Sequence, residues 1–122
     1  AVVTNSTSVI TAAGGNPNVV YFGFDSSEID AQGQAVLNQQ AQFLQANPSA
    51  RAAIAGHTDE RGSREYNLAL GERRAQAAQA YLATSGVSAS RMEAISYGED
   101  QPADPGHDES AWAKNRRAEI SY

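Results

Sequence analysis

The stretch Ala52–Ala75 reads AAIAGHTDERGSREYNLALGERRA and combines a short strand, a polar loop and the start of a long helix. Four apolar residues at 52–55, closed by Gly56, are typical of a buried strand. Ser63 is a favourable N-cap residue, and the pattern after it predicts a helix over 63–85. A loop between a strand and a helix N-terminus is a favoured ligand site in α/β folds.

The sequence on both sides of this stretch supplies the other elements of such a fold. Residues 19–24 are dense in β-branched and aromatic side chains and predict a buried strand. Residues 30–46 carry one apolar helical stripe, and strands are expected over 92–97 and 117–122, the last with Arg117 on a wet face. The order β-α-β-α-β-β predicts an α/β (α+β) two-layer sandwich, with helices on one face of a mixed sheet.

Composition favours one folded domain over 19–122, preceded by a Ser/Thr/Asn/Gly-rich tether over 1–18. The formal net charge of −5 argues against a nucleic-acid-binding protein, which is usually basic. No cysteine is present, so disulfides and thiolate chemistry are excluded. No apolar run approaches the roughly 20 residues that cross a bilayer. We expect a soluble monomer when the domain is isolated.

One charge in the long predicted helix requires an explanation. Steps of three and four place Asn67, Leu70 and Arg74 on the same face, so that Arg74 is a charge on the apolar stripe of this helix. Asp59 lies in the loop just before this helix. Two interpretations are open: an internal Asp59–Arg74 ion pair in a protein-interaction module, or a pocket for a zwitterion. In the pocket, Asp59 would bind an ammonium group and Arg74 a carboxylate.

Several spaced motifs together resemble the OmpA-like domain family, over about residues 20–122, and within it the peptidoglycan-associated lipoprotein branch. They are GHTDERG at 56–62, YNL at 66–68, LGERRA at 70–75 and KNRRA at 114–118. The resemblance implies a domain that binds the peptide stem of peptidoglycan without covalent attachment. The bound residue would be meso-diaminopimelate, whose free end carries both an ammonium and a carboxylate group.

The resemblance also implies a set of ligand-binding positions and a cellular role. The role is to tether the outer membrane to the cell wall at its periplasmic face, with TolB as a second protein partner. We expect membrane attachment only through an anchor that this chain does not carry. The implied site residues are Asp59, Arg74, Asp25, Asn67, Leu70, Arg61, Gly62 and, as a weaker candidate, Arg117.

Catalytic and metal-binding chemistry receive little support. His57 and Asp59 form an H-x-D pair, but a metal site needs further ligands, and we expect His57 to make a structural hydrogen bond instead. Asp25, Asp59 and Glu60 could supply a glycosidase carboxylate pair, yet nothing in the sequence indicates a sugar cleft. We therefore expect no enzyme activity, no metal and no cofactor.

Overall fold

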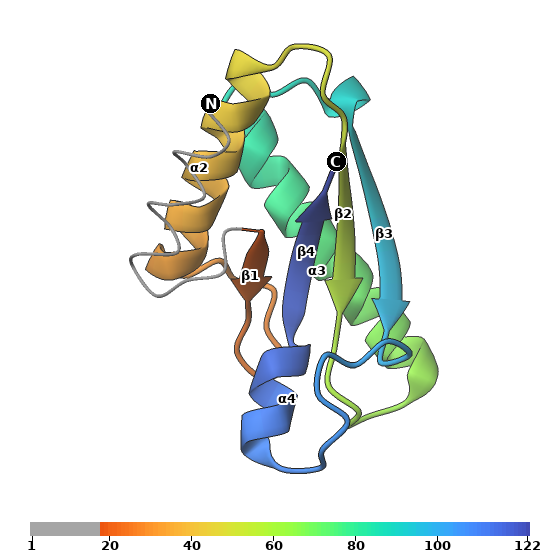
Figure 1. Ribbon diagram of the computed structural model, residues 1–122. Helices are drawn as coiled ribbons and strands as arrows, with labels where there is room; N and C mark the ends of the chain where they lie inside the picture. The colour runs from red at the N-terminus through yellow and green to blue at the C-terminus, as the bar shows by residue number, and fades with distance from the viewer. Residues whose placement is uncertain (1–17) are drawn as a thin grey trace.

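The computed structural model describes residues 18–122, so the expected tether lies outside the described residues except for Asn18. A four-stranded sheet forms one layer (Figure 1). Its order is β1-β4-β2-β3, with β4 antiparallel to both neighbours and β3 parallel to β2. The predicted two-layer fold with a mixed sheet is confirmed. The strands are β1 (Val19–Tyr21), β2 (Ala52–His57), β3 (Met92–Gly98) and β4 (Arg117–Ser121).

Two long helices form the second layer and bury the apolar face of the sheet (Figure 1). They are α2 (Ala31–Ala46) and α3 (Arg64–Thr84), both within a residue or two of the predicted bounds. Each begins with a side-chain cap: Asp30 accepts from the Gly33 amide, and Ser63 accepts from the Tyr66 amide. Capping satisfies amides that have no partner within the helix, which explains why the sequence located these starts well.

A third helix, α4 (Glu109–Asn115), was not predicted. It follows the Pro- and Gly-containing loop after β3 and lies at the lower end of the sheet in Figure 1. Asp108 caps it by accepting from the Ala111 amide at 2.9 Å. The segment between β3 and β4 therefore ends in a helix, which precedes β4 directly.

Two predicted strand features are wrong. The strand expected over 19–24 ends at Tyr21, and Phe24 is 61% exposed rather than buried. Arg117 is 5% exposed instead of lying on a wet face. Its guanidinium donates to the backbone carbonyls of Gln101 and Asn115 and pairs with Glu119. These partners replace water, so the position tolerates burial of a charge.

The core lies between the two layers and fixes the end of β2 against α3. Side chains such as Leu37, Ile54 and Leu82 are fully buried there. The closest approach is made by two glycines: a Cβ on Gly56 of β2 would lie 1.7 Å from the carbonyl oxygen of Gly71 in α3. Only glycine allows two backbones to come this close, and this contact positions the loop that leaves β2.

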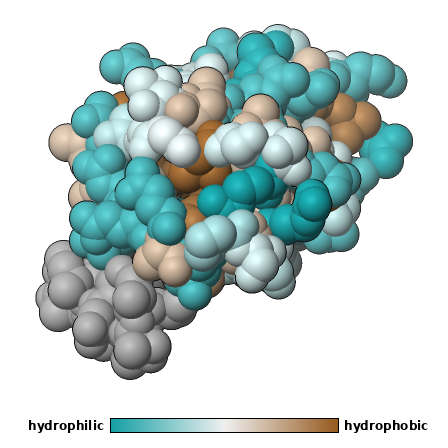
Figure 2. All heavy atoms as spheres, turned by 90° about the horizontal axis from the view of Figure 1, so that it is seen from above, coloured by the Kyte–Doolittle hydropathy of each residue, from teal (hydrophilic) through white to brown (hydrophobic). Residues whose placement is uncertain are grey.

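The surface at the end away from α4 is mostly hydrophilic, with small apolar areas between polar side chains (Figure 2). Scattered apolar groups of this kind are normal on soluble domains. Across residues 18–122, no helix combines the length and the apolar character that are needed to span a membrane.

Candidate functional site

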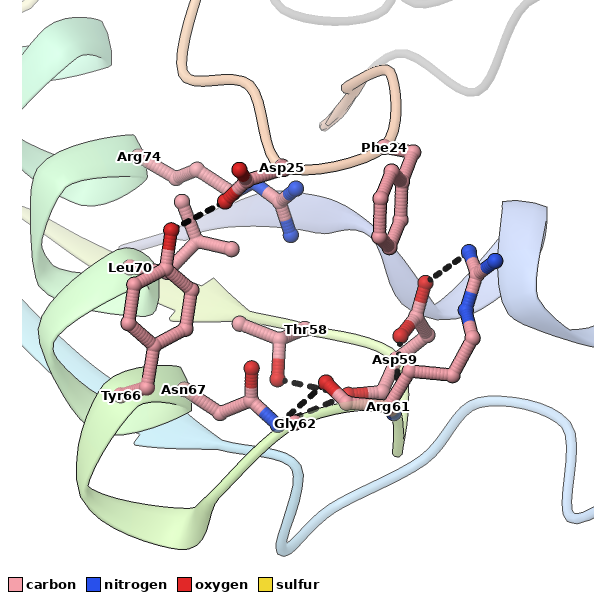
Figure 3. Close-up of a pocket in the computed structure, with 10 residues that line it drawn as sticks. All are labelled: Phe24, Asp25, Thr58, Asp59, Arg61, Gly62, Tyr66, Asn67, Leu70 and Arg74. Carbon is pink, nitrogen blue, oxygen red and sulfur yellow. Dashed lines mark hydrogen bonds and ion pairs between the residues drawn. The ribbon is translucent and has the colours of Figure 1, made fainter.

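A cavity of about 170 Å³ opens where the loop after β2 meets the first turns of α3 and the loop between β1 and α2 (Figure 3). Two segments distant in sequence, one around residues 24–25 and one over 58–74, thus converge at one end of the sheet. Acidic, basic, aromatic and apolar side chains all contribute to the walls. The lining residues are Phe24, Asp25, Thr58, Asp59, Arg61, Gly62, Tyr66, Asn67, Leu70 and Arg74.

Arg74 points from α3 into this cavity and is held by backbone carbonyls (Figure 3). Its Nε donates to Ser26 O at 2.8 Å, and a second donor reaches His57 O at 2.9 Å. A third reaches Gly23 O at 3.1 Å. Burial lowers the pKa of Arg74 to about 10, so the side chain is still charged at neutral pH. A guanidinium has five N–H groups, and those not bonded to carbonyls remain for a ligand.

Asp59 lies in the opposite wall and is 4% exposed. The Arg61 amide donates to its Oδ1 at 3.0 Å, and the Arg61 side chain donates to its Oδ2 at 2.7 Å. Arg116 approaches the same Oδ2 at 3.5 Å. Burial works to raise the pKa of Asp59, but these hydrogen bonds outweigh it and the pKa is lowered. Asp59 is therefore an anion at neutral pH.

Asp59 and Arg74 share the cavity without pairing with each other. In the described part of the chain, Asp59 forms its ion pairs with Arg61 and Arg116, while Arg74 donates to three carbonyls. The sequence left two interpretations open, and the one that predicted an internal Asp59–Arg74 ion pair is wrong. Opposite charges on two walls of one cavity are what the zwitterion interpretation requires.

Asp25 and Tyr66 meet at the rim, where the tyrosine hydroxyl donates to the aspartate carboxylate (Figure 3). Asp25 has φ of 53°, in the left-handed region that non-glycine residues rarely adopt. Such backbone conformations persist where surrounding contacts hold them, and they concentrate at ligand sites. The hydrogen bond joins the loop between β1 and α2 to α3 across the mouth of the cavity.

Asn67 fixes the loop that forms the floor. Its Nδ2 donates to the carbonyls of Asp59 and Arg61, at 3.3 and 3.1 Å, and to the Glu99 carboxylate at 2.9 Å. The loop then turns at Gly62, whose φ of 100° favours glycine. Asn67 thereby holds the backbone on either side of Glu60, and so keeps the Asp59 carboxylate at the cavity.

The structure brings together seven of the eight predicted site residues. Arg117 does not line the cavity, because β4 directs it toward Gln101 and Asn115. Three lining residues were not predicted: Phe24, Thr58 and Tyr66. Thr58 and Tyr66 stand inside the quoted motifs and could have been included on that ground. Arg116, which contacts Asp59 but does not line the cavity, was also missed.

The side chain of His57 does not make the structural hydrogen bond that we expected, although its backbone carbonyl accepts one from Arg74. Its ring is 2% exposed and stacks on Tyr97, with 5.5 Å between the ring centroids. Its Nδ1 has no partner among the described residues. Burial, together with the nearby charge of Arg117, lowers the pKa of His57 to about 4. Within residues 18–122, no group of three His, Cys, Asp or Glu side chains could hold a metal ion.

The shifted pKa of His57 predicts a specific loss of stability in acid. Between pH 6.5 and about 4 the unfolded chain binds a proton at His57 that the folded chain does not. The free energy of unfolding therefore falls as the pH falls through this window, by about 3 kcal/mol from this group. Urea denaturation at several pH values measures it. In His57→Phe, the free energy of unfolding should depend less steeply on pH in this window, whereas His107→Gln should keep the wild-type dependence. An equally steep pH dependence in wild type and His57→Phe would contradict the assignment to His57.

Comparison with known proteins agrees with the motifs. The OmpA family matches residues 21–116. The peptidoglycan-associated lipoprotein of Haemophilus influenzae is 50% identical over 105 residues, which cover 86% of this chain and 69% of that protein. The chain therefore belongs to the OmpA family and groups with its peptidoglycan-associated lipoproteins.

Solved structures give the same result at the level of the fold. The crystal structure of the peptidoglycan-associated lipoprotein from Burkholderia pseudomallei has a TM-score of 0.84 and 48% identity, covering 88% of this chain and 93% of that one. The C-terminal domain of Helicobacter pylori MotB has a TM-score of 0.76 at 23% identity, covering 84% of this chain and 80% of that one. The second likeness shows the shared fold alone.

Proposed function

We propose that this domain binds the peptide stem of peptidoglycan non-covalently, through the free end of meso-diaminopimelate. The observation that carries the proposal is one cavity that presents the Asp59 carboxylate and the Arg74 guanidinium without pairing them. The ligand's ammonium would bind Asp59, and its carboxylate would bind the N–H groups of Arg74 that do not donate to carbonyls. Two opposite charges at separate subsites select a zwitterion over a simple cation or anion.

The remaining lining residues would shape the cavity around the rest of the ligand. Leu70 supplies an apolar wall for the methylene groups between the two ends of diaminopimelate. Asn67 and Gly62 keep the loop in place, and Asp25 with Tyr66 bounds the mouth. Because the three carbonyl bonds already orient Arg74, little conformational entropy remains to be lost when the ligand binds.

The relatives' names support a role in the cell envelope. We infer that the domain tethers the outer membrane to the cell wall at its periplasmic face, with a lipid anchor in the full-length protein. TolB would be a second partner, in a role of the Tol-Pal type. Tethering requires reversible binding rather than bond cleavage, so we propose no catalytic activity.

Replacing the Asp59 carboxylate by an amide tests the ammonium subsite. Asp59→Asn keeps the size of the side chain but removes its charge, so affinity for a muropeptide containing meso-diaminopimelate should fall by about 30-fold or more. Loss of a buried charge pair of this kind costs on the order of 2 kcal/mol or more. Calorimetric titration gives the dissociation constants, and thermal melting verifies that the variant is folded.

The matched control removes an equivalent charge outside the cavity. Asp100→Asn breaks an exposed ion pair with Arg64 and should bind as wild type does. Full binding by Asp59→Asn would exclude the ammonium subsite. A folded wild type that binds no muropeptide would instead favour a domain that acts only through protein partners.

A further inference from the structure

The Arg61 side chain occupies the position at Asp59 that a ligand ammonium group would take. A carboxylate offers about four lone-pair sites. The amide and side chain of Arg61, together with Arg116, already donate to three of them. The bond from the Arg61 guanidinium is the shortest of these, at 2.7 Å. Both sites on Oδ2 are thus taken, so an ammonium group that binds Oδ2 competes directly with a cation supplied by the protein itself.

Two aromatic rings hold the Arg61 guanidinium in this position. Its central carbon lies 4.2 Å from the ring centroid of Phe24 and 4.2 Å from that of Trp112. Both are cation–π contacts, and a flat guanidinium stacks well in such a slot. The indole N–H of Trp112 donates to the Glu60 carboxylate at 2.8 Å, which orients the second ring. In Figure 3 the Phe24 ring and the Arg61 guanidinium lie together at the mouth of the cavity.

In the same position, the Arg61 guanidinium lacks one of its possible hydrogen bonds. Its Nε is buried and has no hydrogen-bond partner among residues 18–122. A buried donor without a partner opposes the conformation that buries it. The side chain as a whole is 32% exposed, so water is within reach if the guanidinium moves outward. The contacts that favour the occluded position are thus partly offset by a cost that disappears when Arg61 leaves Asp59.

We propose that Arg61 occludes the ammonium subsite of the free protein and leaves Asp59 when a ligand binds, an inference that rests on the proposed function. The Arg61 amide stays on Oδ1, whereas the guanidinium gives up Oδ2 to the ligand. Binding energy is partly used to break this internal contact, so the occluded state lowers the apparent affinity. Arg61 is then a positioning residue that regulates the site. When a ligand fills the cavity, the Arg61 guanidinium leaves its place between the rings of Phe24 and Trp112.

Removing the charge of Arg61 should therefore strengthen binding, the reverse of its effect if Arg61 held the ligand. Arg61→Met keeps an unbranched stem between the two rings but frees Oδ2 of Asp59. We expect affinity for a muropeptide with meso-diaminopimelate to rise by roughly three- to tenfold, the size of a partly exposed ion pair. Arg64→Met is the control: it removes the same charge three residues away, where Arg64 pairs with Asp100. Its affinity should equal that of wild type.

A second measurement follows the displacement itself. Trp112 is the only tryptophan in the chain, so its fluorescence reports on the slot. Addition of the muropeptide should shift the emission of wild type and of Arg64→Met, and should leave that of Arg61→Met unchanged. Arg61→Gln provides the same test if Arg61→Met melts below the assay temperature.

The possible results separate the two proposals. Unchanged or weaker binding by both Arg61 variants, with wild type binding normally, would overturn the occlusion and leave the proposed function standing. An emission shift of equal size in wild type and Arg61→Met would also overturn it. A folded wild type that binds no muropeptide would end the proposed function, and the occlusion with it.

Discussion

Replacing Gly56 by alanine is expected to reduce the free energy of unfolding by about 4 kcal/mol or more, a large share of the roughly 5–15 kcal/mol typical of a domain. The added Cβ would lie 1.7 Å from the Gly71 carbonyl oxygen and 2.5 Å from its carbon. Both are backbone atoms of α3, so no side-chain rotation relieves the overlap. The end of β2 would have to separate from α3, and the cavity would open. Urea denaturation followed by circular dichroism measures the loss.

Gly23→Ala is the matched control for this substitution. A Cβ at Gly23 meets only the Ser26 Cβ, at 3.9 Å, an ordinary van der Waals distance. The stability of this variant should stay within about 1 kcal/mol of wild type, since alanine at a compatible position also restricts the unfolded chain. A wild-type denaturation midpoint for Gly56→Ala would contradict the close packing of β2 on α3.

Arg74→Met is expected to abolish muropeptide binding and to destabilise the fold by about 3 kcal/mol. The substitution removes the proposed carboxylate subsite and leaves the carbonyls of Gly23, Ser26 and His57 without their donor. The bond to the His57 carbonyl is buried and the other two are part-buried, and the loss of a donor at such acceptors costs on the order of 1 kcal/mol each. Two of these carbonyls belong to the loop between β1 and α2, so one wall of the cavity loses its attachment to α3.

The measurement pairs calorimetric titration with thermal melting, carried out below the melting temperature of the variant. Arg51→Met is the control, because Arg51 is exposed, lies just before β2 at the opposite end of that strand, and donates one side-chain hydrogen bond, to the Ser90 carbonyl. It should retain both stability and binding. Undiminished binding by folded Arg74→Met would remove Arg74 from the site.

Local signals in the sequence predicted the helices well. Asp30 and Ser63 begin α2 and α3, and both caps depend on residues within three positions. The short helix α4 escaped prediction because seven residues contain too little periodicity, and Asp108 was its main local signal. The burial of Arg117 was missed for another reason: its acceptors include Gln101, 16 residues away in a loop. Alternation along a strand does not reveal such partners.

The sequence indicated where the cavity lies but not which partners Asp59 and Arg74 have. The sequence placed Asp59 and Arg74 near each other, because Asp59 lies just before the long helix and Arg74 lies on the inward face of that helix. Arg74 instead donates to Gly23 and Ser26, 51 and 48 residues earlier in the chain. Asp59 takes Arg61 from its own loop. Long-range contacts to backbone carbonyls leave no signal in a single sequence, because every residue carries a carbonyl.

Titration of the wild-type domain with two muropeptides tests the central claim most directly. The ligands are identical except that one carries meso-diaminopimelate and the other lysine, which has the ammonium group but lacks the second carboxylate. The account predicts binding heat with the first and at least about tenfold weaker binding with the second, since only the first reaches both Asp59 and Arg74. Equal affinity for the two ligands would contradict a zwitterion pocket.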